Sequence, residues 1–184
     1  MDETGRWLRW WRDGFVQGID KSWHRLPWFC LPDADRKSLI EVNPRVSTLF
    51  NISDHLITAP DARALNFIAL SRSQQQAVFA LLGCVCNGDF SGLTESDREW
   101  GERIQKGIRP QIFLPQGFDY RQTDKALFLL KAVLSPGCWY RLRLQFPEPA
   151  VLSAENISET QAITILQRLR TLWDAAIWRI AEHE

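Results

Sequence analysis

The chain has 184 residues, of which 45% are hydrophobic and 24% charged, and its 22 basic and 22 acidic side chains leave no formal net charge. A chain of this length can bury roughly 70% of the surface that it exposes when unfolded, so a core needs no disulfide or metal to hold it. Zero net charge removes the attraction to phosphate backbones on which nucleic-acid binding depends, and we expect no nucleic acid as a partner.

The first predicted element is an amphipathic helix from Arg6 to Ile19, with apolar residues on one face and polar residues opposite. Gly14 and Gly18 each weaken a helix by about 1 kcal/mol, so its second half depends on tertiary contacts. The apolar face comprises Trp7, Leu8, Trp10, Trp11, Phe15 and Ile19.

Helix caps and apolar spacing predict several further helices in the first two thirds of the chain. Asp33 and Asn43 stand at positions typical of N-caps, Ser71 or Ser73 can cap a buried helix, and Thr94 with Asp97 resembles a capping box. The predicted helices cover residues 34–42, 44–52, 60–70, 73–86 and 95–107.

Residues 109–122 contain two prolines and a glycine, which predict an irregular connector. A helix follows from Thr123 or Asp124 to Leu134. Ser135 before Pro136 then favours a helix over 136–145, although RLRLQF alternates like a strand. The prolines of FPEPAV interrupt the helical pattern after it.

The last predicted helix runs from Ser158 to Ala181, with a capping box at Ser158 and Gln161 and an apolar stripe from Ile165 to Ile180. About 24 residues would form a rod of roughly 36 Å. The sequence therefore predicts an all-α protein: one compact multi-helix domain over residues 1–184, with a long amphipathic C-terminal helix.

Catalytic, metal and cofactor sites are not indicated by any residue pattern. Ser53, Asp54 and His55 are adjacent in sequence, a spacing that does not present a catalytic triad. The four cysteines include no C-x-x-C, and His24 and His183 lie far from them, so we expect reduced thiols and no metal. The acids of residues 95–102 alternate with bases, as on a solvated helix face. Glycine-rich phosphate loops are absent, and we expect no cofactor.

The location suggested by the sequence is cytoplasmic. The start lacks the apolar core of a secretory signal, and the longest apolar run, Ala77 to Cys86, is about half a membrane span, so we expect no transmembrane segment. RWLRWW leaves two interpretations open, since arginine beside tryptophan suits both protein packing and the membrane surface.

Nine tryptophans are several times the usual number for a chain of this size. Tryptophan is enriched among the residues that dominate the binding energy of protein interfaces. In a chain without a recognisable catalytic site, this excess favours a protein-binding function.

The segment LLKAVLSPGCWYRLRLQFPEP resembles type III secretion proteins of the SctK type, the YscK, HrpD and OrgA relatives, as do the N-terminal tryptophans and AVFALLG at 77–83. The resemblance implies a non-enzymatic adaptor of the injectisome sorting platform, a virulence apparatus for protein transport. Such an adaptor links an SctD-like inner-ring cytoplasmic domain to an SctQ-like pod protein at the cytoplasmic face of the bacterial inner membrane.

That resemblance carries over no catalytic or ligand motif. Trp139, Arg141 and Arg143 match its recognisable segment, and Trp139 is as well suited to the core as to a contact. Two alternatives stay open, a secretion chaperone or other helical adaptor and an enzyme of unrecognised type. The candidate partner-binding residues are Trp7, Trp10, Trp11, Trp139, Arg141 and Arg143.

Overall fold

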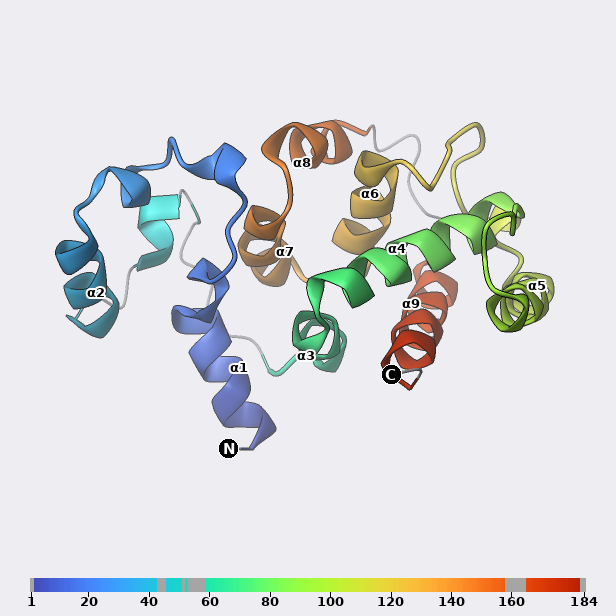
Figure 1. The fold of residues 1–184 in the computed structure, drawn as a ribbon, viewed down its shortest axis with the longest axis horizontal. Coiled ribbons are helices and arrows are strands. Elements are labelled where there is room, and N and C mark those ends of the chain that lie inside the picture. Colours follow the sequence, from blue (N-terminus) through green and yellow to red (C-terminus); the bar gives the residue numbers. More distant parts are fainter. Residues whose placement is uncertain (1, 43–45, 51, 53–58, 158–164, 183–184) are drawn as a thin grey trace. The chain divides into compact units, whose positions relative to one another are not determined.

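The computed structural model of the protein describes residues 2–42, 46–50, 52, 59–157 and 165–182. These residues form nine α-helices and six 3-10 helices, and no strand occurs among them (Figure 1). The predicted all-α fold class is confirmed, and residues 136–145 are helical as expected from the Ser-Pro start.

The backbone divides into two compact units. Unit 1 comprises Met1–Leu65 and Ser135–Val151, and unit 2 comprises Asn66–Leu134 and Leu152–Glu184. Two helices, α3 (Ala62–Ala69) and α8 (Glu148–Glu155), begin in unit 1 and end in unit 2. The single domain over residues 1–184 stays a prediction, because compact units of one chain can belong to one folding domain.

Unit 1 is built mostly from short helices. The longest are α1 and α2, of ten residues each, and the unit also contains 3-10 helices that present few side chains apiece. Besides parts of α3 and α8, its elements are α1 (Glu3–Arg12), η1 (Gly14–Val16), η2 (Lys21–Trp23), η3 (Pro27–Cys30), α2 (Asp33–Val42), η4 (Val46–Phe50), α7 (Pro136–Leu142) and η6 (Arg143–Gln145).

Unit 2 is organised around α4, which packs against α9, α5 and α6. Ser71 and Gln74 form the predicted capping box at the start of α4, and Gly88 ends the helix with a left-handed φ of 73°. Besides parts of α3 and α8, the elements are α4 (Arg72–Asn87), α5 (Glu95–Ile108), η5 (Pro110–Ile112), α6 (Thr123–Val133) and α9 (Leu166–Ala181).

Two sequence predictions about helix bounds are wrong. The N-terminal helix starts at Glu3, because Asp2 caps it by accepting from Gly5 N at 2.9 Å, and it ends at Arg12. The helix does not continue to Ile19, since Gly14 weakens it and Gly18 takes a φ of 77° that a helix excludes.

Helix α8 is an additional helix that the sequence did not predict, because the prolines of FPEPAV were expected to interrupt the helical pattern. Pro149 lies in its first turn, where the missing N–H would have no intrahelical partner. The C-terminal helix begins at Leu166, because Ile165 has a non-helical φ of −130° and ψ of 78°, so the prediction of one continuous helix from Ser158 to Ala181 is wrong. The predicted caps at Asn43 and Ser158 lie outside the described residues.

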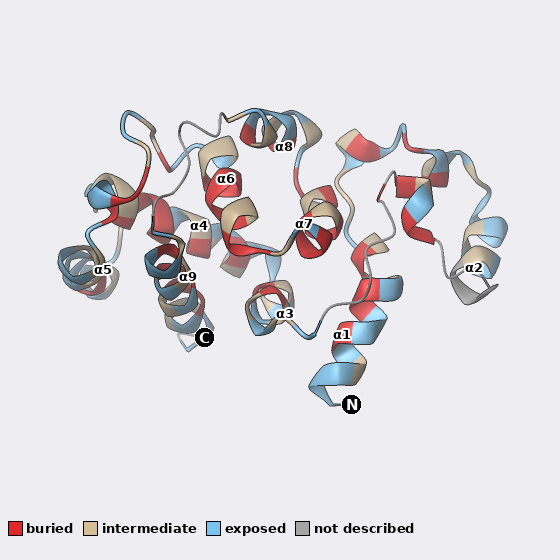
Figure 2. Cartoon of the chain, turned by 180° about the vertical axis from the view of Figure 1, so that it is seen from behind, coloured by how far each residue is buried: buried red, intermediate tan, exposed pale blue. Residues whose placement is uncertain are grey.

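The inner face of α9 forms the centre of the unit 2 core (Figure 2). Trp173 is fully buried and meets the rings of Phe67 and Phe79 edge-on, with centroids 5.7 and 5.8 Å away. Most of the predicted stripe is therefore buried, but Ile165 at its start is 36% exposed. The buried residues of α9 are Leu169, Leu172, Trp173, Ala176 and Ile177.

Removing the side chain of Leu169 or Leu172 should lower the free energy of unfolding by about 2 to 5 kcal/mol, because each leucine is 0% exposed and its loss leaves a cavity. Chemical denaturation of Leu169→Ala and Leu172→Ala measures this. Thr171→Ala, on the exposed side of the same helix, is the matched control and should stay within about 0.5 kcal/mol of the parent. Parent-like stability of both leucine variants would contradict the placement of α9 in the core.

Candidate functional site

Three of the candidate partner-binding residues, Trp7, Trp10 and Trp11, form one aromatic cluster on α1. Trp7 lies 5.5 Å from Trp10 and 5.3 Å from Trp11 between ring centroids, and Trp10 meets Trp11 edge-on at 6.5 Å. The three indoles meet because helical spacing places positions 7, 10 and 11 on one face of α1. Their exposed fractions are 1%, 6% and 3%, so the cluster belongs to the core of unit 1.

Arg141 of α7 joins this cluster and is itself only 3% exposed. Its guanidinium carbon lies 4.0 Å from the ring centroid of Trp11 and 5.6 Å from that of Phe15, which places a cation against two aromatic rings. Its Nε donates to the carbonyl of Trp11 at 2.9 Å, and its Nη1 donates to the carbonyl of Gly137 at 3.1 Å. We call Trp7, Trp10, Trp11 and Arg141 the tryptophan–arginine cluster.

The contact with the Trp11 carbonyl has a clear local cause. Trp11 lies in the last turn of α1, where carbonyl groups have no intrahelical partner and need one from elsewhere. Arg141 supplies that partner from a position 130 residues away in sequence. The planar guanidinium can stack on an indole and donate in its own plane at once, which a lysine cannot do.

The two other candidates, Trp139 and Arg143, lie in α7 and η6 of unit 1. Trp139 is 2% exposed, and Arg143 is half-buried with its guanidinium carbon 4.8 Å from the Tyr140 ring and 5.7 Å from the Trp23 ring. Trp23 in turn donates from its indole to the carbonyl of Phe146 at 2.8 Å. The part of the resembling segment from Ser135 onwards therefore packs inside unit 1, and a partner-binding role for these residues stays a prediction.

The membrane-surface interpretation of RWLRWW loses its physical basis in this structure. An interfacial helix inserts its tryptophans into the lipid headgroups. The three indoles of α1 are instead covered by intramolecular packing, and the exposed side of the helix carries mainly arginines. Among the described residues, no helix combines the length and apolar character needed to span a bilayer.

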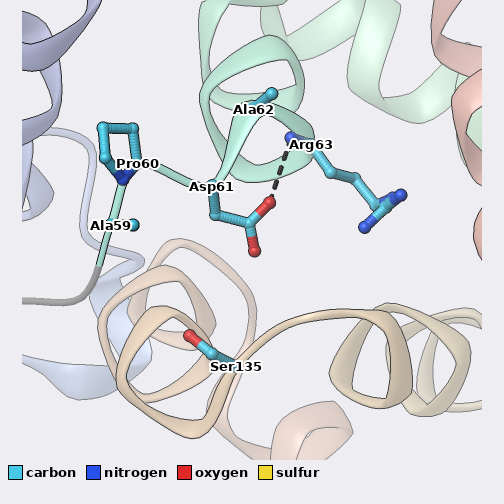
Figure 3. A pocket seen from close by; sticks show the side chains of 6 residues that line it. All are labelled: Ala59, Pro60, Asp61, Ala62, Arg63 and Ser135. Atoms are coloured by element: carbon cyan, nitrogen blue, oxygen red, sulfur yellow. Dashed lines mark hydrogen bonds between the residues drawn. The ribbon is translucent and has the colours of Figure 1, made fainter.

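An open hollow of about 440 Å³ lies beside the start of α3, lined by residues 59–63 and Ser135 (Figure 3). Two of the polar side chains that line it, those of Asp61 and Ser135, accept hydrogen bonds from backbone N–H groups at helix starts. The Asp61 carboxylate accepts from Arg63 N at 3.0 Å and Ala64 N at 3.2 Å, and the Ser135 hydroxyl accepts from Cys138 N at 3.4 Å. These two side chains therefore have a structural role as helix caps beside the hollow.

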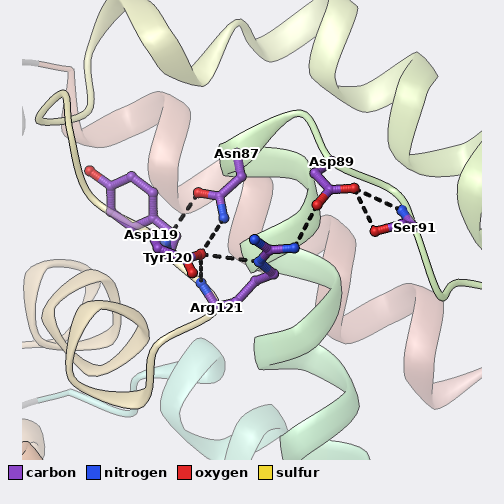
Figure 4. A network of polar contacts seen from close by, with 6 residues as sticks. All are labelled: Asn87, Asp89, Ser91, Asp119, Tyr120 and Arg121. Atoms are coloured by element: carbon purple, nitrogen blue, oxygen red, sulfur yellow. Dashed lines mark hydrogen bonds and ion pairs between the residues drawn. The ribbon is translucent and has the colours of Figure 1, made fainter.

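A polar network in unit 2 fixes the end of the connector over residues 109–122 to the end of α4 (Figure 4). Asn87 donates to Asp119 at 2.6 Å and accepts from Tyr120 N at 3.1 Å, while Arg121 pairs with Asp89 and Asp119. Hydrogen bonds from Arg121 and Asn87 hold the pKa of Asp119 below its usual value. Asp89 and Asp119 are therefore charged and share one guanidinium, and their hydrogen bonds hold the connector backbone in place.

The cysteines and histidines show no catalytic geometry in the described part of the chain. Cys30 is exposed, and burial raises the pKa of the other three thiols, that of Cys138 to about 11, which lowers their nucleophilic thiolate fraction. Residues 2–42, 46–50, 52, 59–157 and 165–182 contain no group of three or more histidine, cysteine or acidic side chains that could hold a metal. Ser53, Asp54, His55 and His183 lie outside these ranges.

Trp178 is the exposed aromatic residue that the sequence interpretation missed. Eight of the nine tryptophans are buried, whereas Trp178 is 58% exposed on α9. The signal was present, since position 178 falls on the polar face of the helical pattern, with Gln167, Thr171 and Asp174. A tryptophan at the centre of a solvated face has no role in the core.

Comparison of the chain with protein-family models, with curated proteins and with solved structures finds no match.

Arg141→Lys should lower the free energy of unfolding by about 1 to 3 kcal/mol, because lysine keeps the buried charge but cannot satisfy two carbonyls while stacking on Trp11. Denaturant titration followed by tryptophan fluorescence measures the change. Arg103→Lys on the exposed face of α5 is the matched control and should change stability by less than about 0.5 kcal/mol. Equal stability of the two variants would mean that the Arg141 contacts contribute nothing.

Two glycines in helices of unit 2 should respond oppositely to alanine. A Cβ at Gly83 in α4 would lie 3.0 Å from Arg121 Cα and from the Tyr120 carbonyl oxygen, so Gly83→Ala should destabilise by about 1 to 3 kcal/mol. A Cβ at Gly107 in α5 meets nothing within 4 Å, so Gly107→Ala should stabilise by about 0.5 to 1 kcal/mol. Thermal and chemical unfolding of both variants test the close approach of the connector to α4.

Proposed function

We propose that this protein is a non-enzymatic adaptor in the cytoplasmic sorting platform of a type III secretion system. In this role it binds an SctD-like cytoplasmic domain of the inner-membrane ring and an SctQ-like pod protein. It works at the cytoplasmic face of the bacterial inner membrane, attached peripherally to a membrane complex. The observation that carries the proposal is the resemblance of LLKAVLSPGCWYRLRLQFPEP, residues 129–149, to SctK-type proteins.

The all-helical fold supports this proposal over a typical secretion chaperone, because such chaperones usually combine a sheet with helices. The resembling segment runs from the second half of α6 through α7 and η6 to the start of α8, and its residues Trp139 and Arg141 are buried. We infer that the segment specifies a helical framework. Binding would then depend on exposed apolar anchors surrounded by charges that set specificity at the rim.

Deletion of the gene in its host should abolish secretion of every type III substrate while the membrane rings still assemble. The measurement is immunoblotting of culture supernatants for several substrates, together with electron microscopy of isolated ring complexes. Complementation with the parent gene should restore secretion. The control variant Gly107→Ala, which changes an exposed helix position, should complement equally well.

Loss of one substrate with normal secretion of the others would identify a dedicated chaperone and contradict the adaptor proposal. A direct test uses the purified protein with the SctD-like cytoplasmic domain and the SctQ-like protein of the same host. Analytical ultracentrifugation should detect one complex containing all three. Competition between the two partners for one site would also contradict a linking role.

A further inference from the structure

Trp178 lies at the centre of the exposed face of α9. The five buried residues of this helix face inward, and Trp178 projects nearly opposite to them at 100° per residue. Figure 2 shows a continuous exposed side along α9. Large aromatic side chains placed in solvent are typical anchors of protein interfaces, because a tryptophan buries 150 to 250 Å² when covered.

Acidic residues flank this tryptophan along the helix. Asp174 and Glu182 stand four positions before and after Trp178, one turn away on each side, and both are exposed. We call Asp174, Trp178 and Glu182 the Trp178 ridge. Its chemistry is a large apolar anchor between two carboxylates, which fits an apolar surface bordered by arginine or lysine.

A surface of that description is present on α1 of the same chain. Leu8 is 45% exposed, at the border of the face of α1 that carries the buried indoles. Arg9 and Arg12 lie beside it on the exposed side, and the Arg12 side chain is 61% exposed even though it pairs with Asp13. Apart from Asp13, the acidic residues at α1 are Asp2 and Glu3, which stand before and in its first turn, away from Arg12. We call Leu8, Arg9 and Arg12 the Leu8 ridge.

We propose that the Trp178 ridge of one molecule docks on the Leu8 ridge of a second copy of this protein. The two surfaces complement each other in charge, and each offers one exposed large hydrophobic side chain to the other. They are different surfaces, so the contact is head to tail, and a docked pair keeps one unused ridge of each kind. This self-association does not depend on the proposed adaptor function.

The contact joins two helix faces and is small, so the association is weak and rapidly reversible. It therefore grows with protein concentration, and it weakens with salt because exposed charges are screened. Because the two joined surfaces differ, a docked pair can add further copies, ending in a closed ring or an open chain.

Sedimentation velocity over a concentration series, at low and high salt, tests the proposal with the full chain. The parent should shift from monomer towards larger species as concentration rises. Trp178→Ala and Leu8→Asp should each weaken association at least about tenfold, the usual effect of removing an interface anchor. Both positions are exposed, so circular dichroism and melting temperature should match the parent.

A mixture of the two variants provides the decisive measurement. Trp178→Ala retains the Leu8 ridge and Leu8→Asp retains the Trp178 ridge, so together they should form a dimer that cannot grow. Leu152→Ala, another exposed leucine at 45%, is the matched control and should associate like the parent.

A parent that stays monomeric at every concentration, or variants that associate as strongly as the parent, would overturn the proposal. So would a mixture that remains monomeric while the parent associates, because the intact Trp178 ridge of one variant would then fail to bind the intact Leu8 ridge of the other. Each of these outcomes leaves the secretion phenotype of the gene deletion unaffected, so the two proposals fail separately.

Discussion

Unit 1 depends on the burial of one positive charge. Arg141 fills the space between Trp11 and Phe15 and donates to the last-turn carbonyl of α1, so it couples two segments that are 130 residues apart in sequence. A buried cation is tolerated only when its environment replaces water on every side. Here two aromatic faces and two carbonyl oxygens do so, and the position of α1 on α7 follows from their geometry.

The surplus of tryptophan has a structural explanation in the same unit. Short helices and 3-10 helices each present few inward positions, so a core built from them needs large side chains to exclude water. Six of the nine tryptophans lie in unit 1, all of them buried. Unit 2 has longer helices, α4 and α9 of 16 residues each, and it needs only Trp100 and Trp173 inside. Trp178 is left without a packing function, which makes its exposure informative.

Helix caps and spacing predicted much of the fold, because they act within a few residues of sequence. Ser71, Thr94 and Ser135 cap helices in the expected places. The end of α1 and the existence of α8 were missed, since a glycine or a proline near a boundary is compatible with either outcome until tertiary packing decides. The tryptophan–arginine cluster could not be predicted, because its partners are brought together only by the folded chain. Trp178 could have been found from its place on the polar face of its helix.

The burial of the resembling segment changes what such a resemblance can mean. Trp139 and Arg141 are buried, so packing constrains which residues can occupy these positions, and their presence indicates a shared fold. The choice of a binding partner depends instead on exposed anchors and the charges around them. Two proteins could therefore share this segment and bind different partners. The surfaces that distinguish this chain are the outer faces of α1 and α9, and each exposes one large apolar side chain. Leu8 of α1 stands beside arginines, and Trp178 of α9 stands between acidic residues. We expect the binding specificity of the protein to depend on these two faces, because Trp139 and Arg141 are buried and hold the fold together.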